Sequence, residues 1–159
     1  GFCLVGSEMC IRDRNHAKKK NIDINYILGE AENLLPENSE EFDVVTCLEA
    51  IEHVPDPNQL VKTCSDLCKK NGDIFFSTIN RNPKSFLFAI VGAEYIFNLL
   101  PKGTHEYQKF IKPSELIFMM ENNGLKIQEL TGMSYNPITK NYWLGKNVDV
   151  NYLIHAKKI

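Results

Sequence analysis

Hydrophobic positions along the chain repeat with two different periods, and the two periods alternate. Short continuous apolar runs predict buried strands, whereas apolar residues three and four positions apart predict helices. Strands that alternate with helices indicate an α/β fold whose core strands are parallel. The predicted strands cover residues 24–28, 42–47, 73–78, 125–133 and 148–157. The predicted helices run from Asp56-Pro57 to Asn71-Gly72 and over residues 85–100 and 113–122.

Cap and turn residues support these boundaries. Asp56 suits the N-cap of a helix and Pro57 its first position, because the aspartate side chain accepts from free backbone N–H groups and proline has none to satisfy. Gly124 is typical of a helix stop. Between the elements, residues 29–41 predict a polar connection and residues 134–147 a long loop. Residues 42–47 are mostly apolar, with Asp43 and Thr46 as the exceptions, and we expect them to form a strand that is buried on both faces.

Composition places the chain among soluble globular domains. Of its 159 residues, 43% are hydrophobic and 24% are charged, which is enough apolar material for one sizeable core. The formal net charge is −2, so we expect no nucleic-acid partner. Five irregularly spaced cysteines without a C-x-x-C pair indicate neither a disulfide framework nor a zinc site. Cys64 and Cys68 lie one helical turn apart on an apolar stripe, which predicts small buried side chains.

The first fourteen residues do not fit this pattern. The stretch "LVGSEMCIRDR", from Leu4 to Arg14, has no amphipathic period, no capping residues and no signal-peptide cleavage site. It matches the translation of a transposase adapter that is used in sequencing libraries. We therefore expect residues 1–14 to be a sequencing artefact and residues 15–159 to be a partial domain that starts near Asn15. A native tail is the alternative.

Two carboxylates and an imidazole follow the strand predicted at residues 42–47. On a helical turn, Glu49, Glu52 and His53 would share one face, because they lie at positions i, i+3 and i+4. Ligands of open α/β sheets bind beyond the carboxyl ends of the strands. Two carboxylates with one imidazole suit a divalent cation, with magnesium or manganese favoured over zinc. The alternative is a solvated helix face on which His53 caps a carbonyl.

The chain resembles the ubiquinone-biosynthesis O-methyltransferase family in "FDVVTCLEAIEHVPDP", "GDIFFSTINRNPKSFLFAIVGAEYI", "LPKGTHEYQKFIKPSEL" and "YNPITKNYWLGKNVDVNYLIHAKK". The resemblance covers nearly all of residues 15–159. Members of this family use S-adenosylmethionine to methylate polyprenylated phenols and demethylubiquinol. The resemblance implies an α/β fold, the C-terminal part of a class I (Rossmann-like) methyltransferase, with a mostly parallel sheet and an antiparallel last strand.

The resemblance also implies roles for individual residues. Leu48 matches a residue that contacts the cofactor, and Glu49, Glu52 and His53 match metal ligands, notably for magnesium. A divalent ion would favour the phenolate form of a phenol, whose pKa is ordinarily near 10. His53 could instead act as a general base. His105, in "KGTHEY", is a second candidate base or substrate contact, with a structural loop histidine as the alternative.

Two cofactor motifs of this family have no match in the chain, namely the glycine-rich loop after the first strand and the acidic residue that ends the second strand. The adenine side of the site remains, with "GEAENL" and Leu48 as floor and wall. Glu30 or Glu32 could accept from the adenine amino group, and Ala31 allows a close backbone approach. Surface solvation is the alternative for the two glutamates. We therefore expect the chain alone to bind the cofactor poorly and to be inactive.

Residues 85–100 are strongly apolar, and Glu94 is the one charged residue between Lys84 and Lys102. A membrane span needs about 20 apolar residues. We therefore expect this helix to lie in a membrane interface, where it could draw a polyprenylated phenol or quinol from the lipid. A buried core or lid helix is the alternative.

An interfacial helix would make the enzyme peripheral, on the cytoplasmic face of a bacterial inner membrane or on the matrix side of a mitochondrial one. It could also join a ubiquinone-biosynthesis complex. Two other functions stay open. One is a class I methyltransferase that acts on another small molecule, and the other is a non-enzymatic lipid-binding or scaffold module.

Overall fold

The computed structural model describes residues 2–4, 8–27, 29–86, 107–136, 139 and 141–159. The strands are β1 (Phe2–Leu4), β2 (Asn25–Ile27), β3 (Phe42–Leu48), β4 (Cys68–Ile79), β5 (Leu125–Asn136), β6 (Asn141–Gly145) and β7 (Asn151–Lys158). The helices are α1 (Glu8–Lys20), α2 (Leu35–Asn38), α3 (Pro57–Leu67), α4 (Pro83–Ser85) and α5 (Pro113–Asn122). Three 3-10 turns are η1 (Ala31–Leu34), η2 (Ile51–His53) and η4 (Tyr107–Lys109).

Five strands form one mixed sheet in the order β3-β4-β7-β5-β6. Strands β3 and β4 are parallel, as the α/β pattern predicts, and α3 supplies the crossover between them. Strand β7, the last in the chain, lies between β4 and β5 and is antiparallel to both, which confirms the antiparallel last strand. Strands β1 and β2 form a separate parallel pair.

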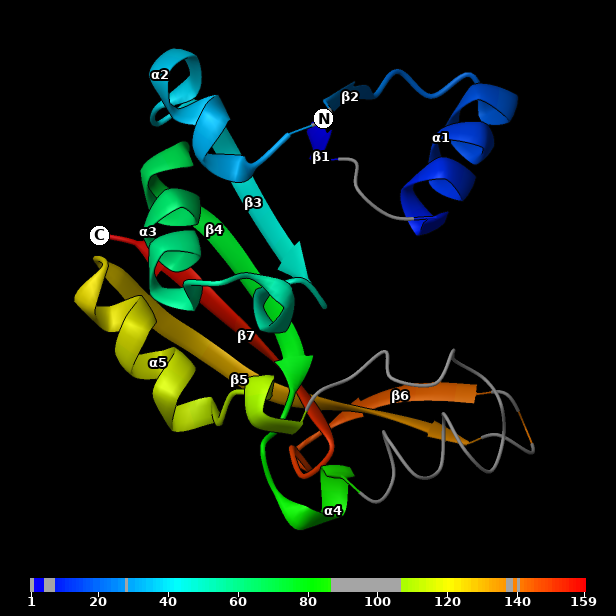
Figure 1. Ribbon diagram of the computed structural model, residues 1–159, viewed down its shortest axis with the longest axis vertical. Coiled ribbons are helices and arrows are strands. Elements are labelled where there is room, and N and C mark those ends of the chain that lie inside the picture. The colour runs from blue at the N-terminus through cyan, green and yellow to red at the C-terminus, as the bar shows by residue number, and fades with distance from the viewer. Residues whose placement is uncertain (1, 5–7, 28, 87–106, 137–138, 140) are drawn as a thin grey trace.

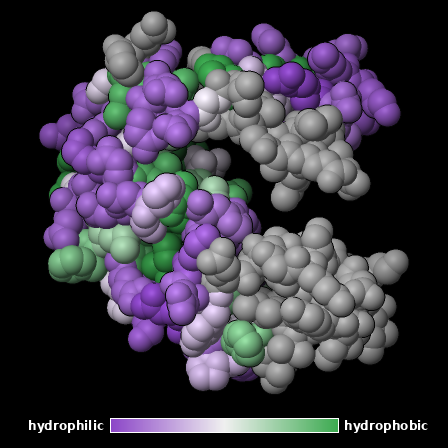
Figure 2. Space-filling view, viewed as in Figure 1, coloured by the Kyte–Doolittle hydropathy of each residue, from purple (hydrophilic) through white to green (hydrophobic). Residues whose placement is uncertain are grey.

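Helices α3 and α5 cover one face of this sheet (Figure 1). Alternate residues of the central strands point at them and are fully buried, for example Ile74 and Phe76 of β4 and Ile154 of β7. They meet Val61 of α3 and Leu116 of α5 in a single core. The outer surface of this helical layer is mostly hydrophilic, with smaller hydrophobic areas (Figure 2). The core therefore lies between one helical layer and one face of the sheet.

Strand β3 is less buried than its sequence predicts. Val44 and Leu48 each keep 53% of their surface exposed, because β3 is an edge strand of the five-stranded sheet and these side chains point to the face opposite α3 and α5. The prediction of a strand buried on both faces is therefore wrong for this chain. An apolar run alone does not reveal whether both faces of a strand are covered.

The predicted start of the third helix is confirmed, but its end lies earlier than predicted. Asp56 caps α3, with its side chain accepting from the backbone N–H of Gln59 at 3.1 Å. The helix ends at Leu67, and Cys68 already has extended backbone as the first residue of β4. Asn71, with φ of 63°, lies where the pairing of β3 and β4 shifts register, so the Asn-Gly pair marks an irregularity in a strand and not a helix stop.

Two predicted loops contain regular structure. The connection at residues 29–41 holds η1 and α2, and the loop at residues 134–147 holds β6, which pairs with β5 as an antiparallel hairpin. The helix predicted at residues 113–122 is confirmed as α5. Most of the apolar stretch at residues 85–100 lies outside the described residues. Within the described part of the chain, no helix is long and apolar enough to cross a membrane.

The burial predicted for Cys64 and Cys68 is confirmed, although Cys68 belongs to β4 and not to the helix; Cys47 of β3 is a third buried free thiol. A hydrogen bond with Cys47 and burial raise the pKa of the Cys64 thiol well above its usual range. The Cys64 thiol therefore stays protonated at neutral pH and acts as a small apolar group.

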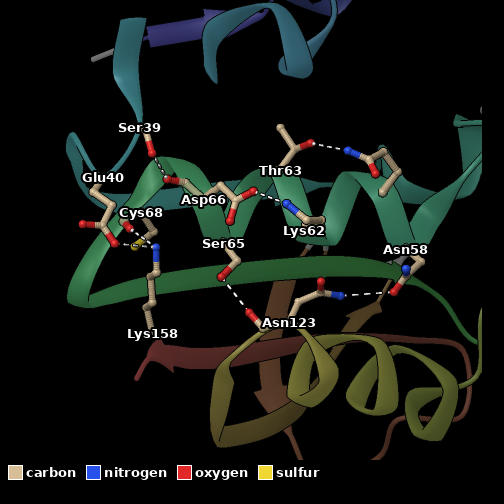
Figure 3. A network of polar contacts seen from close by, with 11 residues as sticks. Ser39, Glu40, Asn58, Lys62, Thr63, Ser65, Asp66, Cys68, Asn123 and Lys158 are labelled. Carbon is tan, nitrogen blue, oxygen red and sulfur yellow. Dashed lines mark hydrogen bonds and ion pairs between the residues drawn. The ribbon is translucent and has the colours of Figure 1, made fainter. Parts of the chain in front are cut away.

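Polar contacts tie the two helices to each other and the C-terminus to the sheet (Figure 3). Ser65 of α3 donates through Oγ to the carbonyl of Asn123 at 2.8 Å, and the Asn123 amide donates to Asn58 Oδ1 at 3.1 Å. Lys158 Nζ donates to the carbonyl of Cys68 and to Glu40 Oε1, each at 3.1 Å. These contacts hold α3 against the end of α5 and hold the C-terminal strand against the amino end of β4.

A close backbone approach holds the segment that precedes β7. A Cβ atom on Gly132 would lie 1.8 Å from the carbonyl oxygen of Asn147, so this position of β5 has no room for a side chain. The adjoining residues in turn hold the chain after β4: the Asn80 side chain donates to the carbonyl of Val148 at 2.9 Å. Gly132 therefore permits the packing that fixes the exit from β4.

Replacing Gly132 with Ala should lower the free energy of unfolding by about 1–3 kcal/mol, because the added methyl group must displace backbone atoms. Gly145 is its cross-strand partner and provides a matched control, since a Cβ atom there would meet nothing within 4 Å. Gly145→Ala should change stability by less than about 0.5 kcal/mol. Urea denaturation followed by circular dichroism measures both, and equal effects of the two substitutions would contradict the packing role of Gly132.

Candidate functional site

The carboxyl end of β3 leads into a strained turn. Leu48 ends the strand, and Glu49 follows in the left-handed region with φ of 51°, which is uncommon for a residue other than glycine. The backbone N–H of Glu49 donates to the carbonyl and to the hydroxyl of Ser77, at 3.0 and 3.1 Å. These bonds to β4 stabilise the turn and bring Glu49 to the carboxyl end of the sheet.

Two adjacent hydroxyl groups at the end of β4 hold two carboxylates. Ser77 Oγ donates to Glu49 Oε1 at 2.7 Å, and Thr78 Oγ1 donates to Glu52 Oε2 at 2.8 Å. Successive side chains of a strand point to opposite faces of the sheet. Glu49 therefore lies toward the face that carries Ser77, and Glu52 toward the face that carries α3 and α5.

Glu52 is deeply buried, with 3% of its surface exposed. Its second oxygen, Oε1, is buried and has no hydrogen-bond partner among the described residues. The side chain of His53 is half exposed, and its Nε2 lies 4.0 Å from this oxygen. A buried carboxylate oxygen without a donor is costly. The site therefore favours a proton donor or a cation that comes from outside the described chain.

The three predicted metal ligands do not share the helical face that their spacing predicts. Turn η2 covers Ile51–His53 and leaves Glu49 outside it, so the spacing argument is wrong in its geometry. Within the described ranges, no group of three or more His, Cys, Asp or Glu side chains is close enough to hold a metal ion. Glu52 and His53 do lie together. The solvated-face alternative is wrong for Glu52, because this side chain is buried.

The predicted cofactor contacts lie on two segments beside the core. Ala31 is buried in η1 and packs in the same core as Cys47 of β3. Glu32 is half buried, whereas Glu30 and Leu48 are exposed. Their role toward a cofactor stays a prediction. His105, the second candidate base, lies outside the described residues.

A pocket of about 300 Å³ lies on the Glu52 side of β4. One of its walls is fixed to the sheet: the Ile111 backbone N–H donates to the carbonyl of Ile79 at 3.3 Å, and the Ile111 carbonyl accepts from Tyr152 Oη at 2.9 Å. Arg81 forms an ion pair with Glu115 of α5. The lining residues are Glu52, Val54, Pro55, Pro57, Arg81, Gln108, Lys109, Phe110, Ile111, Glu115 and Met119.

Sequence reasoning missed Ser77, Thr78 and this pocket. Ser77 and Thr78 could have been found, because two successive hydroxyl residues end an apolar strand and ligands bind at that edge of the sheet. The pocket combines segments near residues 54, 81 and 110, and no local pattern joins them. It follows from the packing of η4 and α5 against the end of β4.

Comparisons with known proteins show which family the chain belongs to. A family model described as a methyltransferase domain matches residues 1–130. Ubiquinone biosynthesis O-methyltransferase of Acinetobacter baumannii strain AYE is 56% identical over 146 residues, covering 91% of the chain and 62% of that protein. The protein of the same name from Saccharophagus degradans is 57% identical over 145 residues, covering 91% of the chain and 61% of that protein. The chain thus spans less than two thirds of these relatives.

Solved structures show the same fold at low identity. A SAM-dependent methyltransferase from Thermotoga maritima has a TM-score of 0.61 and 20% identity, covering 93% of the chain and 70% of that structure. The [4+2]-cyclase SpnF has a TM-score of 0.65 and 12% identity, covering 99% and 66%. These likenesses confirm the predicted class I methyltransferase fold, and the cyclase among them illustrates that the fold alone does not specify the reaction. The chain belongs to the methyltransferase domain family.

Proposed function

We propose that this chain is part of an enzyme that uses S-adenosylmethionine to methylate a hydroxyl group of a polyprenylated phenol or quinol in ubiquinone biosynthesis. The identity of 56% over 91% of the chain to a protein named ubiquinone biosynthesis O-methyltransferase carries the proposal. The carboxylates at the carboxyl end of β3 and β4 support it, because they lie where ligands of this class of sheet bind.

The reaction requires a better nucleophile than a neutral phenol. Methyl transfer is an in-line displacement in which the C–S bond of the cofactor breaks, a C–O bond forms and the phenolic proton passes to a base. A phenol with a pKa near 10 is mostly protonated at pH 7. Glu52 and His53 could bind and orient the hydroxyl, and His53 is a candidate to accept its proton, since a neutral imidazole nitrogen can act as a general base.

A magnesium ion is a further part of the proposal. The buried, unpartnered Oε1 of Glu52 beside His53 fits a cation at this position. Glu49 is the third ligand that the family resemblance implies, although in the described structure its Oε1 accepts from Ser77. When bound, such an ion would lower the pKa of the substrate hydroxyl and so favour the phenolate.

We also propose that residues 85–100 attach the enzyme to a membrane surface, with peripheral attachment to the inner membrane as the expected location. Phe86, at the start of this stretch, is 43% exposed and packs edge-on against the ring of Tyr107 at 5.5 Å. Association with other enzymes of ubiquinone biosynthesis would follow from a shared membrane-bound substrate.

Removing one carboxylate charge should reduce methyl transfer strongly. The test uses a full-length version, in which the chain is extended to the length of its relatives, with labelled S-adenosylmethionine and a short-tailed demethylubiquinol. Glu49→Gln or Glu52→Gln should lower kcat/KM by about 10- to 100-fold, the scale of disturbed metal sites, and raise the magnesium requirement. Glu121→Gln, on the exposed side of α5, is the control.

No O-methylated product from a folded full-length enzyme would refute the proposed function. Full activity in excess chelator would refute the metal role alone and leave the methyltransferase assignment intact.

Membrane attachment should depend on the apolar stretch. Replacing Phe86, Phe88 and Phe97 together with Ser should release the full-length protein from liposomes, because each fully exposed phenylalanine gains about 1.5–3 kcal/mol on leaving water. Phe118→Ser is the control, since Phe118 is 66% exposed on α5. Flotation and a thermal melt are measured together. A folded triple variant that still floats with lipid would contradict the interfacial role.

A further inference from the structure

The chain contains two Asn-Gly pairs, Asn71-Gly72 and Asn123-Gly124, and the structure holds them differently. Asparagine is a chemically labile residue. A following glycine makes it more labile, because glycine has no Cβ atom to hinder its nitrogen from reaching the asparagine side chain. The same dipeptide in two surroundings separates the effect of the fold from that of the local sequence.

Asn71 is exposed, and its side-chain amide has no hydrogen-bond partner among the described residues. Its backbone is in the left-handed region, with φ of 63°. Strand β3 pairs with β4 at Cys68 and then again at Asp73, and β7 pairs with β4 from Asp73 onward. Residues 69–72 therefore lie outside both registers, and sheet pairing does not hold Asn71.

Asn123 is held at both of its reacting groups. Its side-chain amide donates to the carbonyl of Met119 at 2.8 Å and to Asn58 Oδ1 at 3.1 Å. The backbone N–H of Gly124 donates to the carbonyl of Glu121 at 3.2 Å. The first two bonds hold the amide that would leave, and the third holds the nitrogen that would attack, so a reaction at Asn123 must first break them.

We propose that Asn71 is a site of spontaneous deamidation, with water as the only co-reactant. The backbone nitrogen of Gly72 attacks Cγ of Asn71, so that a new C–N bond closes a succinimide ring and the C–N bond of the side-chain amide breaks. The amide leaves as ammonia and takes the proton of the Gly72 N–H. Water then adds to one of the ring carbonyls and opens the ring to aspartate or isoaspartate. No group is oxidised or reduced.

The packing of Gly72 requires the residue that makes Asn71 reactive. A Cβ atom on Gly72 would lie 2.6 Å from the sulfur of Cys68. It would also lie 2.9 Å from the carbonyl oxygens of Asp43 and Lys69. A larger residue at this position would protect the asparagine but would not fit between β3 and β4, so the fold retains the reactive pair.

The two products differ in their effect on β4. Aspartate adds a negative charge near Lys157, whose Nζ lies 3.4 Å from the Asn71 carbonyl oxygen, and it keeps the length of the main chain. Isoaspartate directs the main chain through the former side chain, which adds a carbon atom to it directly before the closely packed Gly72. We therefore expect isoaspartate, and not aspartate, to weaken the packing of β4 against β3.

Incubation of the folded 159-residue chain in a mildly alkaline buffer made with 18O water tests the proposal. Peptide mass spectrometry measures the loss of each amide, and heavy oxygen in the new carboxylate shows that the conversion took place during the incubation. Asn71 should convert at least about tenfold faster than Asn123, because Asn123 must first break its hydrogen bonds. The chain unfolded in urea is the matched control, and there the two pairs should convert at similar rates.

Two variants test the physical reasons behind the difference. Asn58→Ala removes one acceptor of the Asn123 amide, so it should speed the conversion of Asn123 and leave that of Asn71 unchanged. Asn71→Asp introduces the charge without the longer main chain. The midpoint of urea denaturation, followed by circular dichroism, should stay near that of the unmodified chain for Asn71→Asp and should fall for the isoaspartate form isolated by chromatography.

Equal conversion of the two asparagines in the folded chain, or faster conversion of Asn123, would overturn the proposal. So would an Asn71 that keeps its amide in the folded chain while both asparagines convert in urea. An isoaspartate form as stable as the unmodified chain would contradict the expected effect on β4. None of these results depends on methyl transfer, so the inference is tested independently of the proposed function.

Discussion

Hydrogen bonds from two adjacent hydroxyl groups at the end of β4 determine the arrangement of the site. Ser77 and Thr78 point to opposite faces of the sheet, and each holds one carboxylate of the segment after β3. Because the two donors are neighbours on a strand, the two carboxylates cannot lie on the same face while both bonds are kept. This explains why Glu49 and Glu52 are separated although their spacing suggests a shared helical face.

This constraint depends on packing farther away. Pairing of β3 with β4 brings Leu48 opposite Ser77, and the antiparallel β7 supports β4 on its other side. Tyr152 of β7 extends the support to the pocket wall through Ile111. Burial raises the pKa of the Tyr152 hydroxyl, so it stays protonated and keeps donating at neutral and moderately alkaline pH. The positions of the site residues therefore depend on the packing of β3, β4 and β7 in the core.

Local patterns in the sequence predicted the parts of the fold that local interactions decide. Helix α5 and the cap of α3 follow from proline, aspartate and glycine at the right offsets, and both are observed. Strand β6 was missed because its residues pair only with β5 and 53–66% of the surface of Tyr142, Trp143 and Leu144 is exposed, so no buried face marks it as a strand. The end of α3 was misplaced because Asn71 takes a left-handed conformation within a strand as readily as after a helix.

The site was predictable in its composition but not in its geometry. The position of Glu49, Glu52 and His53 after an apolar strand indicated the carboxyl edge of the sheet, and the structure places them there. Which oxygen lacks a partner depends on Thr78, which is 26 residues away from Glu52 in the sequence. Such a contact follows from strand register, and register depends on the whole sheet.

Under the proposed function, the β4 hydroxyl groups position the carboxylates for methyl transfer, and kcat of the full-length Thr78→Val enzyme tests this role most directly. Valine has nearly the shape of threonine and removes only the donor to Glu52. The account predicts a fall in kcat of about tenfold or more, since a buried carboxylate loses its hydrogen bond. The matched Thr131→Val variant, whose hydroxyl bonds to Gly145 away from the site, should keep normal activity. A folded Thr78→Val enzyme with unchanged kcat would contradict the account.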